Sequence, residues 1–198
     1  FMPFDDRRAG FLMGDGGACM ILQSEEKRKE FNSKSYAKLY KCGMASDAVD
    51  MVNPEGTGTR ASMIDALHNY GTGAVDYVCT HGTSTVAGDP IEYEAVSEVL
   101  PGTKMWAPKS KIGHTLAASG ILEGCYAIES MRNGVVPHIQ NLKECSLDVH
   151  DTLVKENEEF TMHNRKRSML NNSFGFGGKC MSQVIEVELE IHERANPE

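Results

Sequence analysis

Two histidine-bearing loops constrain the fold of this 198-residue chain more than any other feature. The first loop, His81-Gly82-Thr83-Ser84-Thr85, follows the apolar run 75–79. The second, Lys109-Ser110-Lys111-Ile112-Gly113-His114, follows the short run 105–107. A helical pattern follows each loop. Because polar loops at the ends of neighbouring strands usually face a cleft, we expect both imidazoles to lie in one site. Two neutral imidazole N–H donors suit a developing oxyanion.

A third loop, Asn171-Asn172-Ser173-Phe174-Gly175-Phe176-Gly177-Gly178, lies between the strand-like runs 168–173 and 181–190. Three of its last four residues are glycines. Glycine permits positive φ and lets the backbone approach a ligand closely. This pattern predicts a tight turn at the edge of a binding site.

The composition is that of an ordinary globular protein, with 40% hydrophobic and 24% charged residues. The formal net charge of −8 argues against nucleic-acid binding. No apolar run approaches the roughly 18 residues that a membrane span needs. We therefore expect no nucleic acid and no membrane among the partners, and we interpret the start at Phe1 as a cut from a longer chain.

Six cysteines are present, without a C-x-x-C pair or the Cys/His spacing of a zinc site, so no metal is expected. Four of them lie in apolar strand-like or helical runs and are predicted to be buried free thiols in a reducing cytoplasm. These four are Cys19, Cys42, Cys79 and Cys125.

The remaining pattern alternates between strands and helices, which predicts an α/β layer. Asp89 is predicted as the N-cap of a helix that reaches about Leu100, with Pro90 at its first position and Glu92 closing a capping box. The other predicted helices are 25–31, 60–70 and 114–132, the last ended by Gly134. The predicted strands outside the loops already named are 16–22, 36–44 and 135–136.

Together, the motifs HGTST, KSKIGH and NSFGFGG resemble the C-terminal half of the β-ketoacyl synthases, which condense acyl and malonyl thioesters. The resemblance runs from Pro3-Phe4-Asp5 to the strand after Gly178. It implies that 1–198 is the C-terminal synthase domain, with 1–24 as the tail end of the N-terminal half. It implies the C-terminal half of a thiolase-like layered α/β fold, with a five-stranded mixed sheet and helices. An inner helix containing 117–123 would face the N-terminal half.

The resemblance also assigns roles. His81, His114 and Lys109 correspond to the catalytic residues. The substrate-binding residues would be Thr83, Thr85, Phe176 and Gly177, with the threonines on the pantetheine arm and Phe176 as a gate. Phe174 is predicted to serve in packing. Glu123 and Asn172 match residues near a structural cation in some members, although Cys79 stands where many relatives carry Asn.

The resemblance implies decarboxylative Claisen condensation in fatty-acid or polyketide synthesis, with no cofactor beyond the phosphopantetheine of an acyl carrier protein. The expected partners are that carrier, the N-terminal half of the synthase and a second subunit in a homodimer or heterodimer. None of the six cysteines lies on a strand-to-helix elbow, so the nucleophile is expected upstream and this chain alone is expected to be inactive.

Two alternatives remain open. The chain can belong to a non-catalytic partner subunit of the chain-length-factor type, which upstream sequence lacking the elbow cysteine would reveal. It can also belong to a thiolase or a type III synthase, although those use catalytic sets unlike the Lys109–His114 motif. Met2, Lys179 and Cys180 depart from the usual family residues and suggest a divergent branch.

Overall fold

The computed structural model describes residues 1–47, 49–50, 54–71, 73–159 and 166–188. Its helices and strands follow one another in the order α1 (Glu25–Glu30), β1 (Lys38–Leu39), β2 (Gly43–Ser46), α2 (Thr57–Tyr70), β3 (Tyr77–Cys79), α3 (Gly88–Val99), β4 (Lys104–Trp106), α4 (Lys109–Ile112), the 3₁₀ helix η1 (Leu116–Ala118), α5 (Ser119–Arg132), β5 (Val135–Val136), β6 (Glu158–Glu159), β7 (Lys166–Gly175) and β8 (Lys179–Glu188).

The main sheet is mixed, as the sequence predicts. Its strand order is β1-β8-β7-β3-β4, with β2 also paired to β8. Strand β3 runs parallel to both β4 and β7, whereas β7 and β8 form a long antiparallel hairpin. Strands β5 and β6 form a separate two-stranded sheet. The parallel centre brings the carboxyl ends of β3, β4 and β7 to one edge, which is where ligands bind in such sheets.

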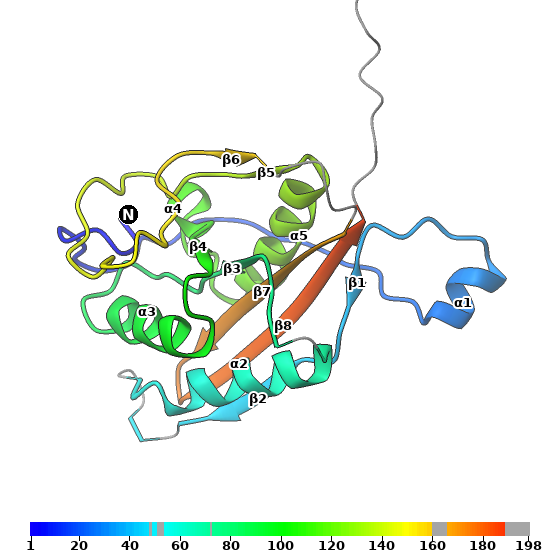
Figure 1. The fold of residues 1–198 in the computed structure, drawn as a ribbon, viewed down its shortest axis with the longest axis horizontal. Coiled ribbons are helices and arrows are strands. Elements are labelled where there is room, and N and C mark those ends of the chain that lie inside the picture. Colours follow the sequence, from blue (N-terminus) through cyan, green and yellow to red (C-terminus); the bar gives the residue numbers. More distant parts are fainter. Residues whose placement is uncertain (48, 51–53, 72, 160–165, 189–198) are drawn as a thin grey trace, which may run out of the picture.

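Helices cover both faces of this sheet, as Figure 1 shows. Adjacent residues of β7 point to opposite faces: the Asn171 side chain reaches the Gly120 carbonyl of α5, and the Asn172 side chain contacts Met63 of α2. Strand residues alternate between faces with a period of two, so both sides of the strand are buried. The result is a three-layer α/β/α arrangement in which α2 and α5 lie on opposite faces.

Within the described residues the sheet has six strands, so the predicted count of five is wrong. The single strand expected over 36–44 is divided into β1 and β2, which both pair with β8. Leu39 pairs with Ile185 and Gly43 with Ser182, which leaves three residues facing two. One extra residue is a β-bulge, and it interrupts the ladder between the two short strands.

The strand expected over 16–22 is also absent. This segment has no regular structure, and the side chains of Ile21 and Leu22 are 87% and 69% exposed. A strand needs a neighbour to take up its backbone hydrogen bonds, and no strand among the described residues pairs with this segment. At the other end of the chain, positions 189 and 190 of the predicted last strand lie outside the described residues.

The predicted cap of α3 is wrong. The helix begins at Gly88 with Ala87 as its cap residue and without a side-chain cap. The Asp89 carboxylate instead accepts a 2.7 Å hydrogen bond from the backbone N–H of Phe4. The Asp89 side chain therefore binds a residue distant in sequence, although its local sequence suits a helix cap. By contrast, α5 ends as predicted, with Gly134 at φ +73° after its last turn.

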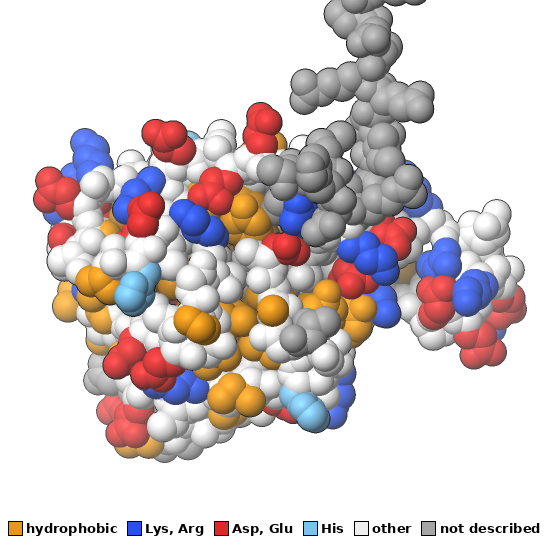
Figure 2. Space-filling model, viewed as in Figure 1, with side chains coloured by type: hydrophobic (Ala, Val, Ile, Leu, Met, Phe, Trp, Pro, Cys, Tyr) orange, Lys and Arg blue, Asp and Glu red, His pale blue; other side chains and the backbone are white. Residues whose placement is uncertain are grey.

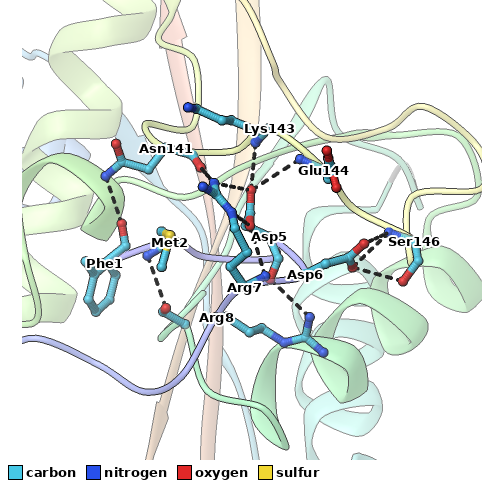
Figure 3. A network of polar contacts seen from close by, with 11 residues as sticks. Phe1, Met2, Asp5, Asp6, Arg7, Arg8, Asn141, Lys143, Glu144 and Ser146 are labelled. Carbon is cyan, nitrogen blue, oxygen red and sulfur yellow. Dashed lines mark hydrogen bonds and ion pairs between the residues drawn. The ribbon is translucent and has the colours of Figure 1, made fainter.

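The N-terminal segment is held against the loop 141–146 by the network in Figure 3. The fully buried Asp5 carboxylate accepts hydrogen bonds from the side chain of Arg7 and from the backbone N–H groups of Lys143 and Glu144. The Arg7 hydrogen bond is the main cause that holds the pKa of Asp5 well below its usual range. This network fixes the start of the chain against the loop 141–146, and the Phe4–Asp89 hydrogen bond ties it to α3.

Acidic and basic side chains are interspersed on the face drawn in Figure 2. Hydrophobic side chains appear between them, over α2 and α3. Among the described residues, no helix is both long enough and apolar enough to cross a membrane.

Candidate active site

The three sequence motifs meet in one cleft of about 510 Å³. The first loop follows β3, the second motif comprises α4 and the two residues after it, and the third comprises the end of β7 and the turn to β8. The predicted site residues that line this cleft are His81, Thr83, Thr85, His114 and Phe176.

The position of His81 is fixed by Glu92, a fully buried residue one turn into α3. The Glu92 carboxylate accepts 2.8 Å hydrogen bonds from the backbone N–H groups of both His81 and Gly82. Burial raises the pKa of this carboxyl, and these backbone bonds counter the rise. Gly82 has φ +36°, and a Cβ there would lie 2.9 Å from Thr80 Oγ1, so the turn favours glycine.

The two imidazoles lie side by side, as the sequence predicts. The ring centroids of His81 and His114 are 5.5 Å apart in an edge-to-face arrangement. Burial, followed by the nearby Lys109 cation, holds the pKa of His81 well below 6.5. The same two causes lower the pKa of His114 to about 4. Both rings are therefore neutral at physiological pH.

The sequence predicts that a helix N-terminus disfavours the imidazolium of His114. The 3₁₀ helix η1, which leads into α5, begins two positions later, and the N–H of its first residue, Leu116, donates to His114 Nδ1. Burial and the Lys109 charge lower the pKa of His114, and this N–H also favours a neutral ring with a lone pair on Nδ1.

The hydrogen bonds also determine which nitrogen carries the proton on each ring. Lys109 Nζ can only donate, and it lies 3.2 Å from His81 Nδ1. The Leu116 backbone N–H, likewise a donor only, lies 3.2 Å from His114 Nδ1. Both Nδ1 atoms are therefore acceptors, and the proton of each neutral ring resides on Nε2. The pair offers two N–H donors to the cleft.

Lys109 is fully buried behind the histidines. Besides His81 Nδ1, its ammonium donates to the His81 carbonyl at 2.6 Å and to Glu123 Oε2 at 2.8 Å. The Glu123 side chain is also fully buried, so the two form a buried ion pair. All three ammonium protons are thus used, and the charge of Lys109 is balanced without solvent.

The structure gives Glu123 and Asn172 different partners. Glu123 pairs with Lys109, whereas Asn172 donates to Glu92 at 3.2 Å and accepts from the Ser182 hydroxyl at 2.8 Å. Among the described residues, no group of three or more His, Cys, Asp or Glu side chains could hold a metal ion. Both side chains are thus engaged by other buried side chains.

Three of the four candidate substrate-binding residues, Thr83, Thr85 and Phe176, line the cleft. The hydroxyls of Thr83 and Thr85 are 3.2 Å apart, and Thr85 also accepts from the Gly88 backbone N–H at 3.0 Å. Phe176 is 64% exposed at the rim. Gly177 has φ +77°, which its turn requires, but it is not among the residues that line the cleft.

Sequence reasoning missed several residues of the cleft. Phe174, predicted to serve only in packing, lines the cleft with its ring centroid 5.5 Å from that of His81. Phe11 lies 5.4 Å from the His114 ring. Glu92 carried a usable signal, because a carboxylate one turn after a helix start can reach backbone amides in the preceding loop.

The cysteines differ in part from the prediction. Cys79 is buried as predicted, but Cys42 and Cys125 are only half-buried and Cys19 is exposed. Cys180 lines the cleft. Burial, with the Asp47 carboxylate, raises the pKa of the Cys180 thiol to about 11, so it is not a ready nucleophile.

Comparison with known proteins agrees with this geometry. The family model for the β-ketoacyl synthase C-terminal domain matches residues 36–143. The chain is 34% identical over 195 residues to 3-oxoacyl-[acyl-carrier-protein] synthase 2 of Coxiella burnetii, a match that covers 92% of this chain and 45% of that protein. A protein of the same name from Mycobacterium bovis is 33% identical over 183 residues, covering 89% and 43%. The chain thus spans less than half the length of these relatives.

Two solved structures have the same fold. A β-ketoacyl synthase from Burkholderia phymatum superposes with a TM-score of 0.86 at 29% identity, covering 96% of this chain and 47% of that chain. The ishigamide ketosynthase/chain length factor gives 0.85 at 26% identity, with the same coverage. From its motifs, its two-histidine cleft and these matches, the chain belongs to the β-ketoacyl synthase family, whose C-terminal domain it contains.

Proposed function

We propose that this chain supplies the malonyl-decarboxylating side of a condensing enzyme. In the proposed reaction the C–C bond to the malonyl carboxylate breaks, CO₂ leaves, and the electron pair forms an enolate on the thioester. His81 and His114 donate their Nε2–H groups to the enolate oxygen. The enolate carbon then attacks an acyl thioester held on a cysteine, and the cysteine thiolate leaves.

One observation carries this proposal: two neutral imidazoles with Nε2–H donors stand 5.5 Å apart beside a cleft of about 510 Å³. Donors fixed in advance toward a site of developing negative charge are the largest single source of catalysis in many acyl-transfer enzymes. A protonated imidazole would be a less selective donor, because it would also bind the malonyl carboxylate and hold it in place.

The substrates would arrive on the phosphopantetheine arm of an acyl carrier protein. Thr83 and Thr85 line the cleft and would offer hydroxyls to the amides of that arm, and the exposed Phe176, which also lines the cleft, would gate an acyl chain. A homodimer, or a heterodimer with a related subunit, is part of the same proposal.

The nucleophilic cysteine would come from a region of the synthase outside these 198 residues. Cys180 is the only cysteine that lines the described cleft, and its raised pKa leaves almost no thiolate near neutral pH. The relatives are more than twice as long as the part that this chain matches, which leaves room for such a cysteine.

The test is malonyl-carrier decarboxylation by the longer protein that we propose contains this chain. His81→Ala should lower the rate by about 10²- to 10³-fold, the usual effect of losing one oxyanion donor. His68→Ala, an exposed histidine on α2, is the matched control and should retain the rate. Wild-type decarboxylation by His81→Ala would overturn the proposal.

The non-catalytic alternative gives a different result in the same assay. A partner subunit of the chain-length-factor type would show no decarboxylation of its own, and its His81→Ala variant would leave the activity of its partner unchanged. A stoichiometric acyl adduct on Cys180, detected by mass spectrometry, would instead contradict the placement of the nucleophile outside this chain.

A further inference from the structure

Each histidine has a buried polar partner behind the cleft. His81 Nδ1 contacts Lys109 Nζ at 3.2 Å, and Lys109 Nζ contacts the Glu123 carboxylate at 2.8 Å. His114 Nδ1 lies 2.9 Å from Ser119 Oγ. Ser119 lies one turn before Glu123 on α5. Lys109, Glu123 and Ser119 are all buried.

Among these side chains, Ser119 is the one whose hydroxyl proton can point to either of two acceptors. Lys109 only donates and the Glu123 carboxylate only accepts, but a serine hydroxyl has one proton and can point it either way. It donates either to His114 Nδ1 or to the Glu123 carboxylate. Thr115 Oγ1, 3.2 Å from Ser119 Oγ, can complete either arrangement.

The backbone decides between the two arrangements. The Leu116 N–H points at His114 Nδ1 from 3.2 Å, so that nitrogen carries a lone pair. If Ser119 gave its proton to Glu123, an oxygen lone pair would face the Nδ1 lone pair across only 2.9 Å. Such a contact is repulsive, so the stable arrangement has Ser119 donating to His114.

We propose that Ser119 is a positioning residue that, together with the Leu116 N–H, holds the His114 tautomer with its proton on Nε2. Its importance for turnover rests on the proposed function, whereas its effect on the tautomer does not. Ser119 does not contact the cleft itself, because it is absent from the cleft lining and is buried beneath His114.

The matched variants lie on one helix. Ser119→Ala removes the hydroxyl, and Ala is a good helix former, so α5 is retained. Ser119→Thr keeps a hydroxyl at the same carbon. Ser130→Ala makes the same chemical change at another buried serine of α5 that has no hydrogen-bond partner among the described residues. It therefore controls for the loss of a buried hydroxyl in this helix.

The primary measurement is the tautomer of His114, read from the ¹⁵N shifts of its ring in the ¹⁵N-labelled chain. Wild type, Ser119→Thr and Ser130→Ala should show an unprotonated Nδ1. In Ser119→Ala the ¹⁵N chemical shift of Nδ1 should move toward the value of a ring that exchanges between its two tautomers. A His114 spectrum of Ser119→Ala identical to that of wild type would overturn the proposal.

A second measurement is the rate of malonyl decarboxylation in the longer protein. Ser119→Ala should lower kcat about 10-fold with KM unchanged, because one neutral hydrogen bond that orients a catalytic donor is lost. Ser119→Thr should recover most of this rate. The tautomer is measured without turnover. An inactive wild-type protein would therefore contradict the proposed function, and the NMR spectra would still test the role of Ser119.

Discussion

The buried Lys109–Glu123 ion pair allows a quantitative prediction about stability. Both side chains are fully buried, and Lys109 Nζ lies 2.8 Å from each Glu123 carboxylate oxygen. Removing one partner leaves an uncompensated charge in the core, which typically destabilises a protein by about 3–5 kcal/mol. Glu123→Leu, which strands the Lys109 ammonium, should destabilise the chain by this amount. Lys109→Met should do so as well, since it also leaves the His81 carbonyl without its donor.

The two single variants should differ in their dependence on pH. Burial raises the pKa of Glu123, and Lys109 is what holds it down. In Lys109→Met the folded-state pKa therefore rises further above the unfolded value of 4.5. A raised folded-state pKa means that stability is lost as pH rises. The destabilisation by Lys109→Met should thus be smaller at pH 5 than at pH 8.

Urea denaturation of the chain and its variants tests this reasoning. The double variant Lys109→Met/Glu123→Leu should be much more stable than the sum of the single effects implies, because apolar side chains replace a buried pair. Lys111→Met, which alters an exposed lysine two positions away, is the control. Additive single effects, each no larger than that of Lys111→Met, would refute the account of a buried pair.

Three further outcomes are expected. Gly43→Ala should destabilise the chain by about 1–3 kcal/mol in urea denaturation, because its Cβ would lie 2.0 Å from the Ser62 carbonyl oxygen, whereas Gly17→Ala, with open space around it, should not. Burial raises the pKa of Asp89 from 3.8 to about 7, so stability should fall as pH rises between these values, and Asp89→Asn should flatten that slope. Iodoacetamide should label Cys180 more slowly than the exposed Cys19, as measured by peptide mass spectrometry, because a thiol with a pKa of about 11 provides little thiolate.

The sequence predicts the positions of the site loops well for a physical reason. Both histidine loops follow parallel strands, β3 and β4, and parallel strands end at the same sheet edge. This topology is enough to bring His81 and His114 together before any coordinates are known. The glycine-rich turn between β7 and β8 joins them because β7 is parallel to β3.

The contacts that tune this site could not be predicted in the same way. Glu92 matches a local capping pattern, yet it binds the backbone of another loop. Burial and the buried Lys109 lower the pKa of His114, and neither cause is visible in the local sequence. Such choices depend on which tertiary partner lies nearest, and local sequence carries no information about that distance.

The errors in the fold have the same origin. Residues 36–44 have a good strand pattern, but the bulge opposite β8 depends on the register between two distant segments. Residues 16–22 are apolar enough for a strand, but a strand forms only where a partner strand is available. Local preference thus identified the elements, and long-range pairing decided their bounds.

The protonation states of His81 and His114 test the central claim most directly. An NMR titration of their ring resonances between pH 5.5 and 8 requires no substrate and no other part of the synthase. Because the pKa of His81 is held well below 6.5 and that of His114 is lowered to about 4, neither ring should take up a proton in this range. Both should keep their proton on Nε2 throughout. Titration of either ring with a midpoint near 6.5 would contradict the account of two neutral donors.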